Sequence, residues 1–278
     1  MRRMVGRLGL ILVGFGVLTF IFVAYQLWGT GLYAANEQSD LHAQFDRTLE
    51  KSDRTPTLNP TPPAAAPGEP VAQIRIPKIG VDEIVVNGVS VADLRMGPGH
   101  YPESPWPGQA GNAAIAGHRT TYGAPFSDLD QLVGGDTIVV RTVQGRFDYL
   151  VTESKVVKPS DVSVLNPRSA ATLTLTTCNP KYSAAQRLVV FADLRANQSP
   201  LPATASGPAA SSAVLNEPGG AITPVVLSGL LALGVGLVWW WLFRRRRRWY
   251  VWLAGASVFL VTFLVFSFYL ERTLPANY

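Results

Sequence analysis

Thr172-Leu173-Thr174-Leu175-Thr176-Thr177 is the most informative segment of the chain for its fold. Threonine and leucine alternate along it, which is the period-two pattern of a β-strand with one apolar face. Cys178 follows directly, and Asn179-Pro180 comes after it. A strand end is a rigid place from which a side chain can project into a cleft. The sequence therefore predicts a strand that presents Cys178.

Short runs of the same kind recur on both sides of this strand. Each is rich in β-branched or aromatic residues, and turn signals such as Gly134-Gly135-Asp136 and Gln144-Gly145 separate them. No long amphipathic helix interrupts the series, so the sequence predicts a mainly β domain, either a barrel or a sandwich. The other runs are Ala72–Ile76, Ile84–Val86, Ala113–Ala116, Thr137–Val140, Phe147–Val151 and Leu188–Phe191.

Two segments of biased composition set the limits of this domain. Proline is dense between residues 55 and 70, which predicts a stiff spacer without regular structure. A second segment, rich in proline, alanine and serine, is expected to be a linker at residues 198–222. We therefore expect one folded domain at residues 71–197, preceded by a juxtamembrane segment and spacer at residues 29–70.

Long apolar runs towards both ends of the chain predict membrane spans. Of the 278 residues, 47% are hydrophobic and only 15% are charged, whereas soluble domains carry about 25% charged residues. The runs lie in residues 1–28, 223–243 and 249–270, and each can cross a hydrocarbon core of about 30 Å as a helix. A cleaved signal peptide is the alternative for the first, but its apolar part exceeds the usual length of about 7–15 residues.

Arginine clusters predict how these spans are oriented. Arg2, Arg3 and Arg7 precede the first span, and residues 244–248 are all arginine. Because positive clusters stay in the cytoplasm, the N-terminus and the 244–248 loop are expected inside the cell. The middle domain and a tail at residues 271–278 are then outside. The net charge of +5 comes from these clusters, so no nucleic-acid partner is expected.

Cys178 is the chain's single cysteine, which excludes an intramolecular disulfide and a multi-cysteine metal site. We expect no metal and no cofactor. The residue could be a buried structural thiol, and as a nucleophile it would need a base or a positive field. His118 follows the run Ala113–Ala116 and is the histidine best placed to act as that base. His42 lies outside the domain, and His100 lies in a Gly/Pro loop.

Thiolate attack on a carbonyl also requires a hydrogen-bond donor for the oxyanion. Arg187 begins the run that follows the cysteine, and adjacent antiparallel strands would place it beside Cys178. Arg119, Arg168 and Arg195 could also serve on these grounds. The ordinary role for any of them is a solvated arginine at the surface.

At these residues the chain resembles a known family. Thr174–Cys178 (Thr-Leu-Thr-Thr-Cys) is similar to the sortase signature Thr-Leu-x-Thr-Cys. Gly111–Arg119 (Gly-Asn-Ala-Ala-Ile-Ala-Gly-His-Arg) resembles the sortase histidine motif, and Arg187–Val190 (Arg-Leu-Val-Val) resembles the strand that carries the family's arginine. The resemblance covers Val71 to about Leu194. The stretches His100–Pro102, Thr120–Phe126 and Thr176–Pro180 look most like class E sortases of high-GC Gram-positive bacteria.

The resemblance implies a sortase-type eight-stranded β-barrel with short helices and a cysteine transpeptidase activity. Cys178 would attack the threonine carbonyl of a sorting signal such as Leu-Pro-x-Thr-Gly or Leu-Ala-x-Thr-Gly. His118 would protonate the leaving glycine amine, and Arg187 would stabilise the oxyanion. Tyr101, Thr176 and Thr177 are the expected substrate-binding residues.

The partners implied are surface proteins with a C-terminal sorting signal, a peptidoglycan-precursor amine as acceptor, and the plasma membrane. Two C-terminal spans depart from the commonest sortase arrangement and leave a pilin-polymerising sortase as an alternative. The lid motif of that class, Asp-Pro-aromatic, is absent, which favours wall anchoring. A non-catalytic membrane scaffold is a remote alternative. The Ser-His-Gly-Cys pattern of an L,D-transpeptidase is absent.

One further segment resembles a substrate. Leu201–Ala205 (Leu-Pro-Ala-Thr-Ala) reads like a sorting signal whose final glycine is replaced by alanine, and an apolar span and arginines follow it. Self-recognition by the cleft around Cys178 is one interpretation. A Pro/Ala linker that matches by chance is the other, and the composition of the segment favours it.

Overall fold

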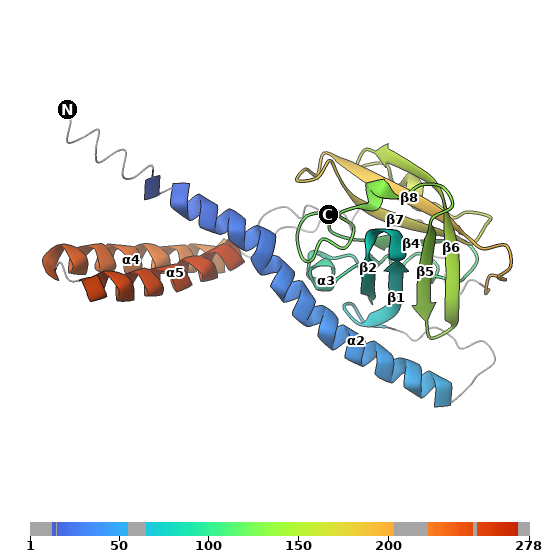
Figure 1. Ribbon diagram of the computed structural model, residues 1–278, viewed down its shortest axis with the longest axis horizontal. Coiled ribbons are helices and arrows are strands. Elements are labelled where there is room, and N and C mark those ends of the chain that lie inside the picture. The colour runs from blue at the N-terminus through green and yellow to red at the C-terminus, as the bar shows by residue number, and fades with distance from the viewer. Residues whose placement is uncertain (1–12, 15, 55–64, 203–221, 247–248, 272–278) are drawn as a thin grey trace. The chain divides into compact units, whose positions relative to one another are not determined.

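The structure is a computed structural model that describes residues 13–14, 16–54, 65–202, 222–246 and 249–271 (Figure 1). The described residues divide into two compact units: residues up to Gly29 together with 222–246 and 249–271 form one, and residues 30–54 and 65–202 form the other. One unit holds the apolar helices and the other holds the β domain.

Two long helices, α4 (Ile222–Arg246) and α5 (Trp249–Glu271), pack against each other in the apolar unit. The Trp239 ring of α4 lies 6.0 Å from that of Trp252 and 5.8 Å from that of Phe259, between centroids. Among the described residues, two segments are long and apolar enough to cross a membrane, Thr223–Arg244 and Trp252–Leu270. The first predicted span is described only in part: residues 1–12 and 15 lie outside the described residues, and residues 13–14 and 16–28 are helical.

Eight strands close into a barrel in the order β1-β2-β3-β4-β7-β8-β6-β5, which confirms the predicted barrel class (Figure 1). Neighbouring strands are antiparallel except for the parallel pairs β2–β3 and β4–β7. The strands are β1 Pro70–Ile76, β2 Val81–Asn87, β3 Gly99–His100, β4 Asn112–Ala116, β5 Thr137–Thr142, β6 Gly145–Val157, β7 Thr172–Asn179 and β8 Gln186–Leu194.

The helices of the barrel unit are short, apart from α2 (Thr30–Arg54). The α-helix α3 spans Val91–Met96 and begins at a capping box formed by Ser90 and Asp93. The remaining ones are single 3₁₀ turns at Pro77–Ile79, Leu129–Gln131 and Val162–Leu165.

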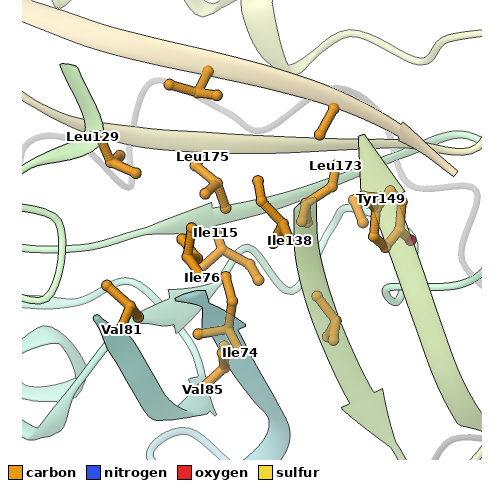
Figure 2. Close-up of a cluster of buried hydrophobic side chains, with 14 of the residues drawn as sticks. Ile74, Ile76, Val81, Val85, Ile115, Leu129, Ile138, Tyr149, Leu173 and Leu175 are labelled. Atoms are coloured by element: carbon orange, nitrogen blue, oxygen red, sulfur yellow. The ribbon is translucent and has the colours of Figure 1, made fainter. Parts of the chain in front are cut away.

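The apolar alternation in the strands fills the inside of the barrel. Leu173 and Leu175 of β7 meet Ile115 of β4 and Ile138 of β5 there, and all four are fully buried (Figure 2). The one polar atom of Tyr149 in this core is satisfied, because its hydroxyl accepts a 2.6 Å hydrogen bond from the Gly108 N–H. Burial of this kind contributes about 1.5–3 kcal/mol for each large side chain and is the main source of rigidity under the site.

Helix α2 (Thr30–Arg54) packs on the outside of the barrel, past α3, β1 and β2 (Figure 1). Leu41, Phe45 and Leu49 are spaced by four residues, so they form one face, and they cluster with Ile84 and Val86 of β2. The compact unit therefore begins at Thr30, whereas the sequence placed the start of the domain at residue 71.

Leu201 pairs with Gln109 in an isolated β-bridge, at the end of the barrel opposite to Cys178. Its N–H donates to the Gly108 carbonyl and its carbonyl accepts from the Ala110 N–H, at 2.9 and 2.8 Å. The carbonyl of Gly111, the residue after Ala110, accepts a hydrogen bond from the Thr172 N–H at the start of β7. Because β7 rises about 3.3 Å per residue, the start of this strand lies roughly 20 Å from Cys178.

Candidate active site

Cys178 lies near the C-terminal end of β7, on the strand face that points away from the core. Leu173 and Leu175 fill the barrel interior, so by alternation Thr176 and Cys178 share the opposite face. Only 4% of Cys178 is exposed. Burial raises the pKa of its thiol, and the positive charges of Arg187 and Arg119 oppose the rise.

Arg187 lies directly opposite Cys178 in the antiparallel β7–β8 ladder. Side chains of directly opposed residues share one face, with Cβ atoms about 5 Å apart. The guanidinium Nη1 donates to the carbonyls of Ala184 and Gln186, both at 3.2 Å, which holds it at the start of β8. The structure thus brings a fixed positive charge to the thiol.

His118 follows β4, the other neighbour of β7. The parallel β4–β7 register ends with Ala116 opposite Thr176, and the Gly117 N–H still donates to the Thr176 carbonyl at 3.1 Å. His118 therefore follows at the end of β7 that carries Cys178. The imidazole is buried. Its Nδ1 lies 3.4 Å from the Thr121 hydroxyl, and its ring centroid lies 5.2 Å from that of Tyr122. Among the three adjacent strands, β4 therefore leads to the histidine, while β7 carries the cysteine and β8 the arginine.

The predicted substrate-binding residues fall into two groups. Tyr101 is buried, which raises the pKa of its phenol, while a hydrogen bond with Thr176 and the charge of Arg187 oppose the rise. Tyr101 and Thr176 therefore lie together on the Cys178 face. Thr177 points the other way, and its hydroxyl donates to the Gly117 carbonyl at 2.7 Å. That bond ties the end of β7 to the residue before His118.

Arg119, which the sequence left open as an oxyanion donor, has a different task. Its buried Nη1 donates to the Cys178 carbonyl at 3.1 Å and to Asn179 Oδ1 at 2.7 Å, and its Nη2 lies 3.0 Å from the Asp130 carboxylate. All three bonds fix the backbone and the loop behind the thiol. Sequence reasoning missed this role, because only the fold shows that Arg119 reaches from β4 to β7.

Arg168, Arg195 and His100 have structural partners away from the thiol. The Arg168 guanidinium lies 3.9 Å from the centroid of Phe191, and Arg195 Nη2 donates to the Thr137 hydroxyl at 3.4 Å. His100 Nε2 contacts the carbonyl of Pro105 at 3.0 Å and the hydroxyl of Ser104 at 3.1 Å. Burial lowers the pKa of His100 to about 4, so it stays neutral and structural.

No cluster of three or more metal-ligating side chains occurs among the residues that the structure describes. What the arrangement can do chemically follows from its three groups. A buried thiol needs a proton acceptor and a positive field to act as a nucleophile. His118 and Arg187, on opposite sides of β7, are the candidates for these two tasks.

Comparisons with known proteins match this domain. The Sortase domain family model matches residues 74–195. Sortase SrtE1 of Streptomyces coelicolor is 35% identical over 202 residues, which are 66% of this chain and 55% of that protein. Sortase D of Bacillus subtilis is 32% identical over 128 residues, which are 45% of this chain and 63% of that protein. The chain thus spans little more than half the length of these curated relatives.

The solved structure of a sortase D5 transpeptidase from Clostridium perfringens is similar in fold. It is 30% identical in sequence, has a TM-score of 0.50, and aligns over 58% of this chain and 99% of that chain. The residues that the family model matches contain the three adjacent strands β4, β7 and β8, and of the barrel strands they leave out only the first four residues of β1.

Proposed function

The chain belongs to the sortase family, and we propose that it is a cysteine transpeptidase that cleaves a C-terminal sorting signal between threonine and glycine. The new carboxyl end is then joined to an amine of the cell wall. One observation carries this proposal: β7, which carries Cys178, lies between β4, which leads to His118, and β8, which carries Arg187 as its second residue.

The first half of the reaction forms a thioester. The Cys178 thiolate attacks the threonine carbonyl, and the negative charge that develops on the oxygen is stabilised by the Arg187 guanidinium. His118 gives a proton to the glycine amine as the peptide bond breaks. The acyl group is then held on Cys178, and the glycine peptide leaves.

The second half reverses the direction of proton transfer. An acceptor amine attacks the thioester, His118 takes the proton that the amine loses, and Cys178 leaves as a thiolate. Burial raises the pKa of the Cys178 thiol and so disfavours the thiolate, whereas the charges of Arg187 and Arg119 favour it. Turnover draws on the thiolate fraction that Arg187 and Arg119 maintain.

The cellular setting is part of the proposal. We place the barrel outside the cell on a multi-pass anchor in the plasma membrane. The two apolar helices α4 and α5 support this, because in the sequence the run Arg244–Arg248 covers the last residues of α4 and the residues before α5, and such a positive cluster marks the cytoplasmic side. Surface proteins with a sorting signal are the proposed donors, and a peptidoglycan precursor is the proposed acceptor.

The test uses the full-length protein in detergent micelles and two fluorescence-quenched peptides, which differ only in Leu-Pro-x-Thr-Gly against Leu-Ala-x-Thr-Gly. We expect cleavage of one or both after threonine, and an amide product when triglycine is added as acceptor. Cys178→Ala is the matched control and should show neither. Equal cleavage by wild type and Cys178→Ala would contradict the proposal.

A further inference from the structure

Tyr122 lies four residues after His118 and forms the wall against which the imidazole rests. The two rings are inclined by 32° with their centroids 5.2 Å apart, a distance typical of aromatic pairs. Tyr122 is itself buried and has a φ of +51°, a conformation that residues other than glycine rarely adopt. Something outside the loop must hold it there.

Helix α2 supplies that support. The Tyr122 N–H donates to the Thr30 hydroxyl at 3.2 Å, and the Tyr33 ring meets the Tyr122 ring edge-on, with centroids 6.1 Å apart and planes at 83°. On the barrel side, the Arg95 guanidinium of α3 lies 5.7 Å from the Tyr122 centroid. The first turn of α2 thus contacts both the backbone and the ring of Tyr122.

The rest of α2 is fastened to the barrel independently of Tyr122. The Gln38 amide donates to the carbonyls of Ile84 and Met96, at 3.0 and 2.9 Å, and accepts from the Ile84 N–H at 2.7 Å. Further along, Leu41 and Phe45 are buried against β2. Thr30 and Tyr33 are therefore presented by a rigid element and not by a flexible leader.

We propose that Tyr122 is a positioning residue for His118, and that Thr30 and Tyr33 of α2 hold Tyr122 in place, so that the membrane-proximal helix is part of the active site. This inference rests on the proposed transpeptidase function. General acid–base catalysis requires the imidazole to point at the leaving amine, and an error of about 1 Å can cost on the order of 100-fold in rate. By sequence, Thr30 lies just beyond the predicted first span.

Point variants of the full-length protein in detergent test the proposal. We expect Tyr122→Ala and Tyr33→Ala each to lower kcat about tenfold on the sorting-signal peptides with KM almost unchanged. Tyr122→Phe keeps the ring and should keep the rate. Thr30→Val should lose activity and Thr30→Ser should retain it. Leu32→Ala is the matched control, since 71% of Leu32 is exposed on the same turn of α2.

A double variant shows whether Tyr33 acts on His118 through Tyr122 or independently of it. If Tyr33 acts through Tyr122, then Tyr33→Ala combined with Tyr122→Ala should be no slower than Tyr122→Ala alone. Independent, multiplying losses would overturn the proposal.

The second readout needs no turnover. Carbon-13-labelled histidine gives three imidazole signals, from His42, His100 and His118, and His118→Gln assigns the last. The signal of His118 should move in Tyr122→Ala and Tyr33→Ala and stay in place in Tyr122→Phe and Leu32→Ala. An unchanged signal in folded Tyr33→Ala would overturn the inference. Absence of peptide turnover by wild type would instead refute the proposed function. The histidine signals would then still show whether Tyr33 and Tyr122 position the His118 ring.

Discussion

Cys178 and Arg187 face each other across the β7–β8 ladder, and the ladder continues without a break from Thr172 opposite Asp193 to Asn179 opposite Gln186. A regular ladder fixes the Cβ atoms of the two residues about 5 Å apart, and the hydrogen bonds from Arg187 Nη1 to the carbonyls of Ala184 and Gln186 hold the guanidinium. The positive charge is thus built into the barrel before any substrate binds, and no loop has to close to bring it there.

Arg187→Ala should therefore have two separable effects. Loss of the oxyanion donor should lower kcat/KM about 100-fold or more. Removal of the positive charge should also raise the pKa of the Cys178 thiol further, so that alkylation by iodoacetamide at pH 7 becomes slower. A pH series of alkylation rates measures the second effect. Arg168→Ala is the control, because Arg168 stacks on Phe191 and should change neither.

Arg119→Met should weaken both the stability and the activity. It leaves the Cys178 carbonyl and the Asn179 side chain without their buried donor, which costs about 1–3 kcal/mol of unfolding free energy. The end of β7 should then loosen and kcat should fall. Asp130→Asn provides the comparison, because this partner is half exposed and its ion pair is worth at most about 1 kcal/mol. Equal losses in the two variants would contradict the assigned role.

The raised pKa of Glu83 should make the stability of the fold depend on pH. Burial, and then the charge of Asp82, raise the pKa of the Glu83 carboxyl from 4.5 to about 7. The folded protein therefore retains a proton that the unfolded chain releases between pH 4.5 and 7, and the contribution of Glu83 to stability falls as pH rises through this window. Glu83→Gln should remove this part of the decline in Tm. A Tm profile from pH 5 to 8 that is the same in both proteins would show that Glu83 does not titrate in this range.

Helix α2 should be needed for a stable barrel. A fragment of residues 71–197 exposes Ile84 and Val86, which α2 covers in the structure, and it also lacks Leu201. We expect this fragment to have a lower Tm and a greater tendency to aggregate than residues 30–202. Phe45→Ala in the longer fragment should cost about 3–5 kcal/mol. Equal Tm values for the two fragments would show that α2 is dispensable.

The Leu201–Ala205 segment should not be processed by the enzyme itself. Leu201 pairs with Gly108 and Ala110 at the end of the barrel opposite to Cys178, while Thr204 lies outside the described residues. The linker interpretation is therefore preferred. Intact-mass spectrometry of the membrane-purified protein should show no C-terminus at Thr204. Its appearance in wild type, and not in Cys178→Ala, would establish self-processing.

The sequence predicted structural features that depend on adjacent residues, but not those that depend on contacts between distant segments. The strand before Cys178 was predictable, because its alternation of threonine and leucine is contiguous along the chain. The strand β3 was missed, since Gly99 and His100 are too few to form a pattern. The packing of α2 was also missed, although Leu41, Phe45 and Leu49 carried a helical period, because Ile84 and Val86 lie far away in sequence.

The candidate site divides in the same way. Motifs of adjacent residues pointed to Cys178, His118 and Arg187, whose roles remain predictions. The tasks of Arg119 and Tyr122 depend on contacts between segments that only the fold brings together. Sequence alone ranked Arg119 as a rival of Arg187, since both are arginines near a motif. The hydrogen bond from Arg119 to the Cys178 carbonyl distinguishes them.

The most direct measurement is the intact mass of the protein after brief incubation with a sorting-signal peptide, in the absence of an acceptor amine. Wild type should gain the mass of the peptide up to threonine, as an adduct that hydroxylamine removes and that maps to Cys178. His118→Ala should form it more slowly and Cys178→Ala should not form it. An adduct that persists in Cys178→Ala, or a peptide that wild type cleaves without passing through a hydroxylamine-sensitive adduct, would contradict thioester catalysis at Cys178.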